Sequence, residues 1–236
     1  MRFTAKGFSE AGRGKPNQDA FLIKSIDDNT LVIAIADGMG GTYGGDIASK
    51  LAIDVISEQI NTQSGSISSL FSKVKSAIQE KALETPDFER MGTTLTLALI
   101  QDNNVTLGHV GDSRLYHLRA NGIVSKTKDQ TEVQKLLDDG ILTKERAKNY
   151  HRRNVLLSVL TSSRDYELQM DTFKVEVGDR LVLMTDGAYS LILKKELRDL
   201  SLNSSSIDDY LYSIRKMIVS RPIRDDYTVV ALEANY

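Results

Sequence analysis

The chain has 236 residues, of which 41% are hydrophobic and 26% are charged, so it can fold around a core of ordinary size. The formal net charge of -2 excludes a general nucleic-acid-binding surface, and no apolar run approaches the ~18 residues that span a membrane. The absence of cysteine excludes disulfides, thiolate metal sites and a cysteine nucleophile. We expect a single domain over residues 1–236, in a soluble cytoplasmic protein.

The first half of the chain alternates strand patterns with two consecutive helices. A turn at Asp27-Asp28-Asn29 separates strands expected at residues 19–26 and 30–36. From Gly45 on, helical spacing predicts an apolar face made by Ile47, Leu51, Val55 and Ile56. A second helix is expected from about Ile67 to Leu83, with a face made by Leu70, Phe71, Val74 and Ile78. Further strands are expected at residues 93–100, 105–110 and 114–118.

The second half begins with a polar segment that leaves the sheets. Residues 129–160 favour helix over strand, and Asp138-Asp139-Gly140 divides them. A helix is expected at about 207–219, where the Ser206 hydroxyl can cap the first turn and Asp209 follows three residues later. The remaining strands are expected at residues 173–175, 180–185 and 227–232.

Two of the expected strands, residues 31–36 and 181–184, are apolar at every position. Such strands are covered on both faces, whereas a strand with one wet face alternates in polarity. The helices come in consecutive pairs between groups of strands, which argues against a doubly wound parallel sheet. The pattern predicts an α+β fold in which antiparallel sheets pack together and helices cover the outside.

Asp37 follows the apolar run 31–36 and precedes Gly38-Met39-Gly40-Gly41. A dinucleotide-binding loop would need glycine at position 43, which is Tyr43, and a P-loop would need Gly-Lys-Ser/Thr. Two interpretations stay open on these residues alone. One is a cation site made by the Asp37 carboxylate and the Gly38 carbonyl, and the other is a turn in which Asp37 caps the next helix.

Other aspartates recur at strand ends: Asp186 follows residues 181–185 and Asp225 precedes residues 227–230. Each one singly fits a turn, but carboxylates gathered in one cleft repel one another and need cations. The histidines do not indicate a zinc site, since no two of His109, His117 and His151 are spaced as a pair of zinc ligands. Oxygen ligands favour Mg2+ or Mn2+ over Zn2+.

Three shorter motifs are weak when each is taken alone. Asp19, in Asn17-Gln18-Asp19, can bind a metal, and the preceding Arg13 and Lys15 can meet an anionic substrate or lie in a solvated loop. Gly92-Thr93-Thr94 has the pattern of a strand entry. Gly111-Asp112-Ser113-Arg114 has the pattern of a hairpin turn.

As an ordered set, these motifs resemble the metal-dependent Ser/Thr protein phosphatases of type 2C. The matching runs are Asn17-Gln18-Asp19, Asp37-Gly38-Met39-Gly40-Gly41, Gly92-Thr93-Thr94, Gly111-Asp112-Ser113-Arg114, Thr185-Asp186-Gly187 and Asp225-Asp226-Tyr227-Thr228. They span about residues 7–231. Arg152-Arg153-Asn154-Val155-Leu156 is similar to the run that follows the flap in bacterial members.

The resemblance implies a four-layer αββα sandwich of two antiparallel sheets flanked by helix pairs, with a flap at about residues 129–160. It also implies two metal ions bridged by Asp37, with the Gly38 carbonyl on the second ion. Asp186 and Asp225 would complete the first ion, and Asp19 would hold metal-bound water. Asp112 would serve a third, weaker ion together with Asp186.

The activity implied is hydrolysis of phosphoserine and phosphothreonine on proteins, by water that two Mn2+ or Mg2+ ions activate. Asp37, Asp186 and Asp225 would be catalytic, and Arg13 and Lys15 would bind substrate. The implied partners are phosphoproteins made by a bacterial Ser/Thr kinase, with no nucleic acid and no membrane. We expect a monomer.

The sequence departs from the family pattern at four places. Gly14 stands where an arginine is common, Thr42 where many bacterial members have histidine, Tyr150-His151 where His-Pro is usual, and Asp226 where asparagine is usual. One alternative is therefore an inactive pseudophosphatase that binds phosphoproteins or another partner. A third hypothesis is a related phosphatase acting on anti-sigma-factor antagonists. The retained aspartates favour an active enzyme, because a dead site has no need to gather like charges.

Overall fold

The structure is a computed structural model that describes residues 1–12, 14, 16–39, 44–60 and 66–235. The strands are β1 (Arg2–Glu10), β2 (Asp19–Ser25), β3 (Thr30–Met39), β4 (Gly92–Thr93), β5 (Leu95–Gln101), β6 (Asn104–Val110), β7 (Arg114–Arg119), β8 (Gly122–Ser125), β9 (Leu160–Thr161), β10 (Gln169–Lys174), β11 (Arg180–Met184) and β12 (Tyr227–Asn235). The helices are α1 (Gly45–Gln59), α2 (Ile67–Glu84), α3 (Glu132–Asp138), α4 (Lys144–Lys148), α5 (Asp186–Tyr189), α6 (Lys194–Asn203) and α7 (Ile207–Val219), with a 3-10 turn η1 (Pro86–Phe88).

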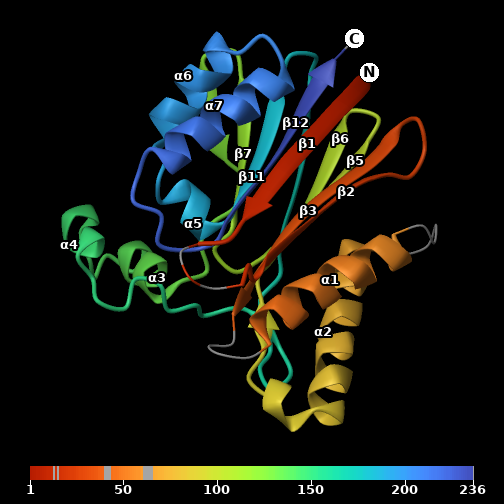
Figure 1. Cartoon of the computed structure of the whole chain (residues 1–236), viewed down its shortest axis with the longest axis vertical. Coiled ribbons are helices and arrows are strands. Elements are labelled where there is room, and N and C mark those ends of the chain that lie inside the picture. Colours follow the sequence, from red (N-terminus) through yellow and green to blue (C-terminus); the bar gives the residue numbers. More distant parts are fainter. Residues whose placement is uncertain (13, 15, 40–43, 61–65, 236) are drawn as a thin grey trace.

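The strands form two antiparallel sheets that pack face to face (Figure 1). One sheet has the order β1-β12-β11-β7-β8. The other has the order β10-β6-β5-β3-β4-β9, and β2 pairs with residues 31–37 of β3. The predicted antiparallel arrangement is therefore confirmed, and together with the helices outside the sheets it gives the expected four layers.

The core between the sheets comes from the strands that are apolar at every position. Ile33 and Ile35 of β3 meet Leu181 and Leu183 of β11 in one buried cluster. The alternate residues of the same strands face the helices, so residues 32–36 and 180–184 are buried throughout. This confirms the prediction that both strands are covered on both faces.

The helices α1 and α2 cover the outer face of the β3 sheet (Figure 1). All four residues predicted for the buried face of α2 are buried, from Leu70 to Ile78. The predicted face of α1 is shifted, because Ala48 and Ala52 line the contact with Ile56. Small side chains let this helix lie close to the sheet, and the larger Ile47, Leu51 and Val55 flank the contact.

The second helical layer, α5 to α7, covers the β11 sheet. The predicted helix at 207–219 is confirmed with its cap, since the Ser206 hydroxyl accepts a hydrogen bond from the Asp209 amide at 3.2 Å. The sequence patterns did not predict α5 or α6. The helix α6 is short and mostly polar, and Leu197 is its only buried residue.

Two connections differ from expectation in ways that matter for the site. Asp37 and Gly38 lie inside β3 and not after it, because Gly38 and Met39 still pair with β4. Residues 111–113 do not close a hairpin, since β6 belongs to one sheet and β7 to the other. The chain crosses between the sheets at this point.

The polar segment at 129–160 leaves the sandwich as predicted and carries α3 and α4 (Figure 1). Neither helix buries a residue. The break between them falls at Gly140, whose φ of +69° lies in the left-handed region that glycine tolerates. An isolated bridge between Thr131 and Leu156 closes the base of the segment, which we call the flap, residues 129–160.

Within the residues described, we find no helix with the length and the apolar character that crossing a membrane requires.

Candidate metal centre

The predicted site residues lie at one end of the sandwich, where strands of both sheets finish. Asp37 on β3 is directly opposite Asp19 at the start of β2. Asp186 begins α5 after β11, and Asp225 precedes β12. The Thr185 amide donates to the Thr228 carbonyl at 3.2 Å, which joins the ends of β11 and β12. The fold thus gathers residues that are up to about 200 positions apart.

Asp19 is held by two threonine hydroxyls. Thr185 Oγ1 and Thr228 Oγ1 donate to its Oδ2 at 2.8 and 2.7 Å. The side chain is 6% exposed, and burial raises the pKa of Asp19 to about 7 although both hydroxyls lower it. Its Oδ1 accepts no hydrogen bond from the part of the chain that the structure describes, so it can serve a ligand.

Asp37 is surrounded by like charges. Burial raises the pKa of its carboxyl well above the usual value, and the charges of Asp19 and Asp186 raise it further. Burial and the charge of Asp225 likewise raise the pKa of Asp186, against a hydrogen bond that it shares with Asp37.

Asp112 belongs to the same electrostatic group. Burial is the main cause that raises its pKa to about 8, and the negative charges of Asp186 and Asp129 raise it further. The residue sits directly after Gly111, whose φ of +113° is left-handed. A Cβ on Gly111 would lie 2.5 Å from Thr94 Cβ, so both conformation and space require glycine there.

Gly38 also has no room for a side chain. A Cβ would lie 2.0 Å from the Gly45 carbonyl oxygen and 2.6 Å from that of Gln18. Its amide donates to the Gln18 carbonyl at 3.1 Å. The backbone after Asp37 is therefore fixed against two neighbouring segments, as a carbonyl ligand would require.

The donor set fits hard divalent cations. It consists of carboxylates and a backbone carbonyl, without histidine or sulfur. No three acidic or histidine side chains among the described residues stand together closely enough to coordinate one ion by themselves. Mg2+ commonly takes one or two carboxylates and keeps several waters, whereas a structural zinc site is closed by four protein ligands.

Three predicted positions cannot be placed. Arg13 and Lys15, expected to bind substrate, and Thr42, which stands where many bacterial members have histidine, lie outside the residues that the structure describes.

Asp226 has a role that the sequence did not indicate. Its two carboxylate oxygens accept hydrogen bonds from the Gly12 and Gln18 amides at 2.6 and 2.7 Å. It therefore holds the two ends of the segment that precedes Asp19. A Cβ on Gly187 would lie 1.9 Å from the Asp226 carbonyl oxygen, so this turn also packs tightly on α5.

Arg114 supplies positive charge beside the cluster. Its guanidinium makes two hydrogen bonds to Asp129, at 2.9 and 2.6 Å, and stacks 3.7 Å above the Tyr189 ring. It acts on Asp112 and Asp186, whose pKa values it lowers against the stronger effect of burial. The pair with Asp129 also ties the start of the flap to β7.

Gln130 links the flap to the Asp112 loop. Its Oε1 accepts from the Gly111 amide and its Nε2 donates to the Glu167 carbonyl, both at 2.8 Å. Its backbone amide donates to the Gly111 carbonyl, and its carbonyl accepts from Leu157. One residue thus connects the loop before Asp112 with both sides of the flap base.

Gln130→Ala should expose the Gly111 amide and lower its hydrogen-exchange protection about 10-fold, because one buried hydrogen bond is lost. Gln169→Ala is the matched control, since Gln169 makes a similar double bridge to the backbone of Lys126 and Lys128. That variant should loosen residues 126–128 and leave Gly111 protected. Equal effects of both variants on Gly111 would contradict a specific role for Gln130.

The comparisons with known proteins agree with this architecture. The serine/threonine phosphatase stp of Listeria welshimeri is 30% identical over 230 residues, which cover 93% of this chain and 90% of that protein. The crystal structure of the Mycobacterium tuberculosis serine/threonine phosphatase PstP/Ppp superposes with a TM-score of 0.88 at 28% identity, covering 100% of both chains. The catalytic domain of PstP in complex with two manganese ions gives a TM-score of 0.84 at 27% identity, with 99% of each chain covered. The family model described as protein phosphatase 2C matches residues 6–221, and the chain therefore belongs to the protein phosphatase 2C family.

Proposed function

We propose that this protein is a Mn2+- or Mg2+-dependent phosphatase of phosphoserine and phosphothreonine in proteins. The observation that carries the proposal is the group of carboxylates Asp19, Asp37, Asp112 and Asp186, whose pKa values are raised by burial and by neighbouring charges. The charge of Asp225 contributes to the raised pKa values of Asp37 and Asp186. Such a group is stabilised when divalent cations bind to it. Relatives with this fold are named Ser/Thr phosphatases, and PstP has been crystallised with two manganese ions.

Asp37 would hold both ions and the Gly38 carbonyl the second, with Asp186 and Asp225 on the first. Because no three described carboxylates stand close enough to share one ion, Asp186 and Asp225 would move toward the first ion when it binds. A third, weaker ion would use Asp112 and Asp186. When bound, these ions supply an activated water and neutralise the charge of the phosphate group. The protein's part is to fix its carboxylates at the strand ends, where bound ions would keep them ionised.

Asp19 has a distinct task in this proposal. Its Oδ2 is occupied by Thr185 and Thr228, which fix the orientation of the carboxylate. The other oxygen is then available to accept a hydrogen bond from water held at the site and so to orient that water. Asp225 is oriented in a related way, because its Oδ1 accepts from the Asp226 amide at 3.0 Å.

We infer that the natural substrates are phosphoproteins produced by a Ser/Thr kinase in the same cytoplasm. Arg13 and Lys15 are the candidates for holding the substrate phosphate, since both precede Asp19 closely in the chain.

The test is hydrolysis of p-nitrophenyl phosphate and of a phosphothreonine peptide with Mn2+, with Mg2+ and with a chelator. Metal-dependent turnover is expected, and it should vanish in chelator and in Asp37→Ala and Asp37→Asn. The matched control is Asp54→Ala, which removes an exposed carboxylate from α1 and should keep full activity. A folded protein without turnover on either substrate, with any metal, would contradict the proposal and favour a phosphoprotein-binding module.

A further inference from the structure

The outer part of the flap is strongly basic. Residues 143–153, which we call the flap arm, comprise α4 and the turn after it. The arm has five basic side chains and a single carboxylate, whereas the whole chain has a net charge of -2. The basic residues are Lys144, Arg146, Lys148, Arg152 and Arg153, and all of them are exposed.

Most of this positive charge is not neutralised within the protein. Arg152 pairs with Glu132 at 2.7 Å. Lys144, Arg146, Lys148 and Arg153 have no carboxylate within ion-pair distance in the described part of the chain. Lys144 and Lys148 are four residues apart on one short helix, where like charges are mildly destabilising. Because α4 buries no residue, core packing does not explain this arrangement.

The arm is nevertheless held in a defined position. Glu132, in the first turn of α3, accepts hydrogen bonds from Tyr150 Oη at 2.5 Å and from the Arg152 guanidinium. Hydrogen bonds from Arg152 and Tyr150 lower the pKa of Glu132 to about 2, so the contact persists throughout the physiological pH range. Just before Glu132, Gln130 joins the flap base to Gly111, beside Asp112. A chain of direct contacts therefore runs from the arm to the carboxylate site.

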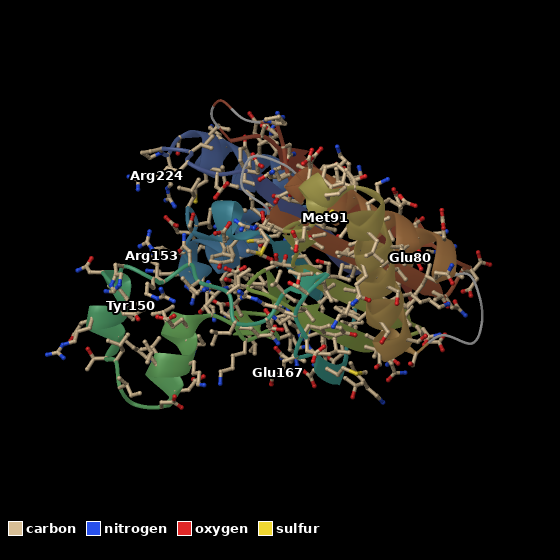
Figure 2. The ribbon with its side chains drawn as sticks, turned by 90° about the horizontal axis from the view of Figure 1, so that it is seen from below. Glu80, Met91, Tyr150, Arg153, Glu167 and Arg224 are labelled. Atoms are coloured by element: carbon tan, nitrogen blue, oxygen red, sulfur yellow. The ribbon has the colours of Figure 1, made fainter. Side chains whose placement is uncertain are left out.

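The arm lies at the same end of the molecule as the candidate metal centre. In Figure 1, α3 and α4 project from the sandwich below α5, the helix that begins with Asp186. In the view from below, Arg153 lies between Tyr150 and Arg224 (Figure 2). Arg224 directly precedes the proposed ligand Asp225.

We propose that the flap arm binds the acidic residues that flank the phosphorylated residue of a protein substrate. The ligand class is an acidic phosphopeptide, with Asp, Glu or a second phosphate on one side of the scissile phosphate. An exposed basic arm attracts such a peptide over several ångströms and sets its direction across the site. A nucleic-acid-binding surface would be expected to spread basic residues over a larger part of the protein. Here they are concentrated in the arm, and the overall charge of the chain is negative.

This proposal rests on the proposed phosphatase function and names its substrate class. The experiment compares two phosphothreonine peptides of one length, one with Asp and Glu flanks and one with Asn and Gln flanks. In the protein with Lys144→Gln, Arg146→Gln and Lys148→Gln, the preference in kcat/KM for the acidic peptide should fall about 10-fold, through KM. The loss should be larger at low ionic strength, since exposed charges are screened by salt.

The matched control replaces Arg164, Lys174 and Lys216 by Gln. These side chains are exposed, lie outside the flap and have no ion-pair partner among the described residues, so the variant removes an equal charge without changing the arm. Its preference for the acidic peptide should equal that of the wild type. An arm variant with unchanged preference, or a control with an equal loss, would overturn the proposal.

Peptide binding keeps the two proposals separable. Fluorescence anisotropy with the labelled acidic peptide should show binding that weakens about 10-fold in the arm variant. Binding without turnover would sink the phosphatase function and support the arm. Turnover that does not depend on the arm would support the phosphatase function and contradict the proposal for the arm. Equally tight binding of a single-stranded oligonucleotide of the same charge would also overturn the assignment to acidic peptides.

Discussion

In the presence of a chelator, the melting temperature should fall by about 6–12 °C between about pH 5.5 and about pH 8.5. The reason is the set of buried aspartates at the site. In the folded protein, burial raises the pKa of Asp19 to about 7 and that of Asp112 to about 8, and the pKa values of Asp37 and Asp186 are also raised. In the unfolded chain the pKa values of these aspartates lie near the ordinary 3.8 of a solvated carboxyl.

The direction of the effect follows from proton binding. Between these two sets of pKa values the folded protein holds protons that the unfolded chain has released. The stability that they contribute is complete below about pH 4 and is lost as the pH rises through 7 and 8. About 3 kcal/mol is expected over this range, since one pKa unit corresponds to ~1.4 kcal/mol and the groups share their repulsion.

Saturating Mn2+ should remove this slope, because the bound ions pair with the ionised carboxylates. The stabilisation by Mn2+ should therefore grow with pH, and differential scanning fluorimetry at several pH values can measure it. Asp112→Asn should flatten the slope in chelator by removing one of the titrating groups. Equal slopes with chelator and with Mn2+ would show that the pH dependence arises elsewhere.

Measurements above about pH 5 separate this effect from ordinary acid denaturation. Glu196 is paired with Arg221, and hydrogen bonds from Arg221 and the Leu193 amide lower its pKa to about 2. Its contribution has the opposite sign, since it is present above the unfolded pKa of 4.5 and is lost as the pH falls toward 2.

The double-sheet core could be predicted because a strand that is buried on both faces is apolar at every position. Residues 31–36 and 181–184 are apolar throughout, and both proved to be inner strands. The end of β3 was harder to predict, since Asp37, Gly38 and Met39 do not have a strand composition. Pairing with Thr93 and Gly92 extends the strand, and this partner lies more than 50 residues away.

The helix α6 shows a second limit of sequence patterns. Its ten residues, KKELRDLSLN, are mostly polar, and its apolar side is short, because Leu197 is buried and Leu200 only partly buried. Its ends are stabilised by distant groups: Arg221 pairs with Glu196 near the start, and Arg180 binds the Ser201 carbonyl near the end. A helix held mainly by tertiary contacts is not visible in a local pattern.

The aspartates of the candidate site could be predicted from the sequence, and the residues that support them could not. Asp37, Asp186 and Asp225 stand at strand ends in the sequence itself. The hydroxyls that orient Asp19 come from Thr185 and Thr228, which a local pattern does not distinguish from any strand threonine. The role of Gln130 depends on its contact with Gly111, 19 residues earlier in the chain, so it leaves no local sequence pattern.

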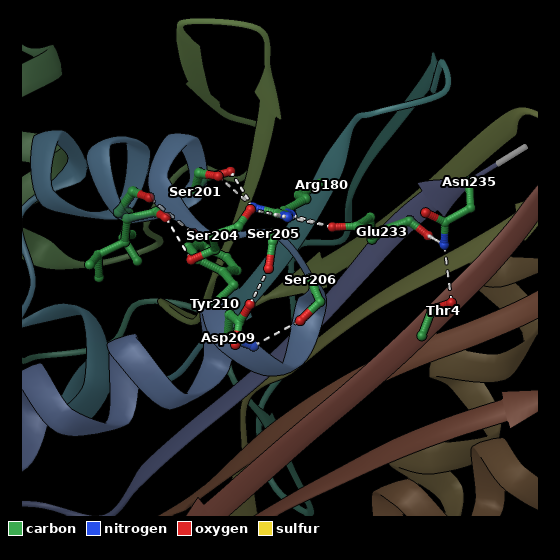
Figure 3. A network of polar contacts seen from close by, with 12 residues as sticks. Thr4, Arg180, Ser201, Ser204, Ser205, Ser206, Asp209, Tyr210, Glu233 and Asn235 are labelled. Carbon is green, nitrogen blue, oxygen red and sulfur yellow. Dashed lines mark hydrogen bonds and ion pairs between the residues drawn. The ribbon is translucent and has the colours of Figure 1, made fainter.

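Arg180→Ala should destabilise the protein by about 3–5 kcal/mol, because it leaves a partly buried carboxylate without its partner. The Arg180 side chain is 9% exposed and contacts Glu233 at 2.5 Å. Its other nitrogens donate to the carbonyls of Ser201 and Ser204 at 2.6 and 3.2 Å, at the end of α6 (Figure 3). One guanidinium thus joins two sheet strands to the last turn of a helix, whose carbonyls would otherwise lack partners.

The expected fall in melting temperature is about 6–15 °C. Lys6→Ala is the matched control: Lys6 pairs with Asp208 at a similar distance, 2.7 Å, but the two side chains are 49% and 66% exposed. This variant should change stability by less than about 1 kcal/mol, because solvent screens the pair. The double variant Arg180→Met with Glu233→Leu should recover part of the loss, since no charge then remains unpaired. If Arg180→Ala were as mild as Lys6→Ala, the end of α6 would be held by apolar packing alone and the guanidinium would be dispensable.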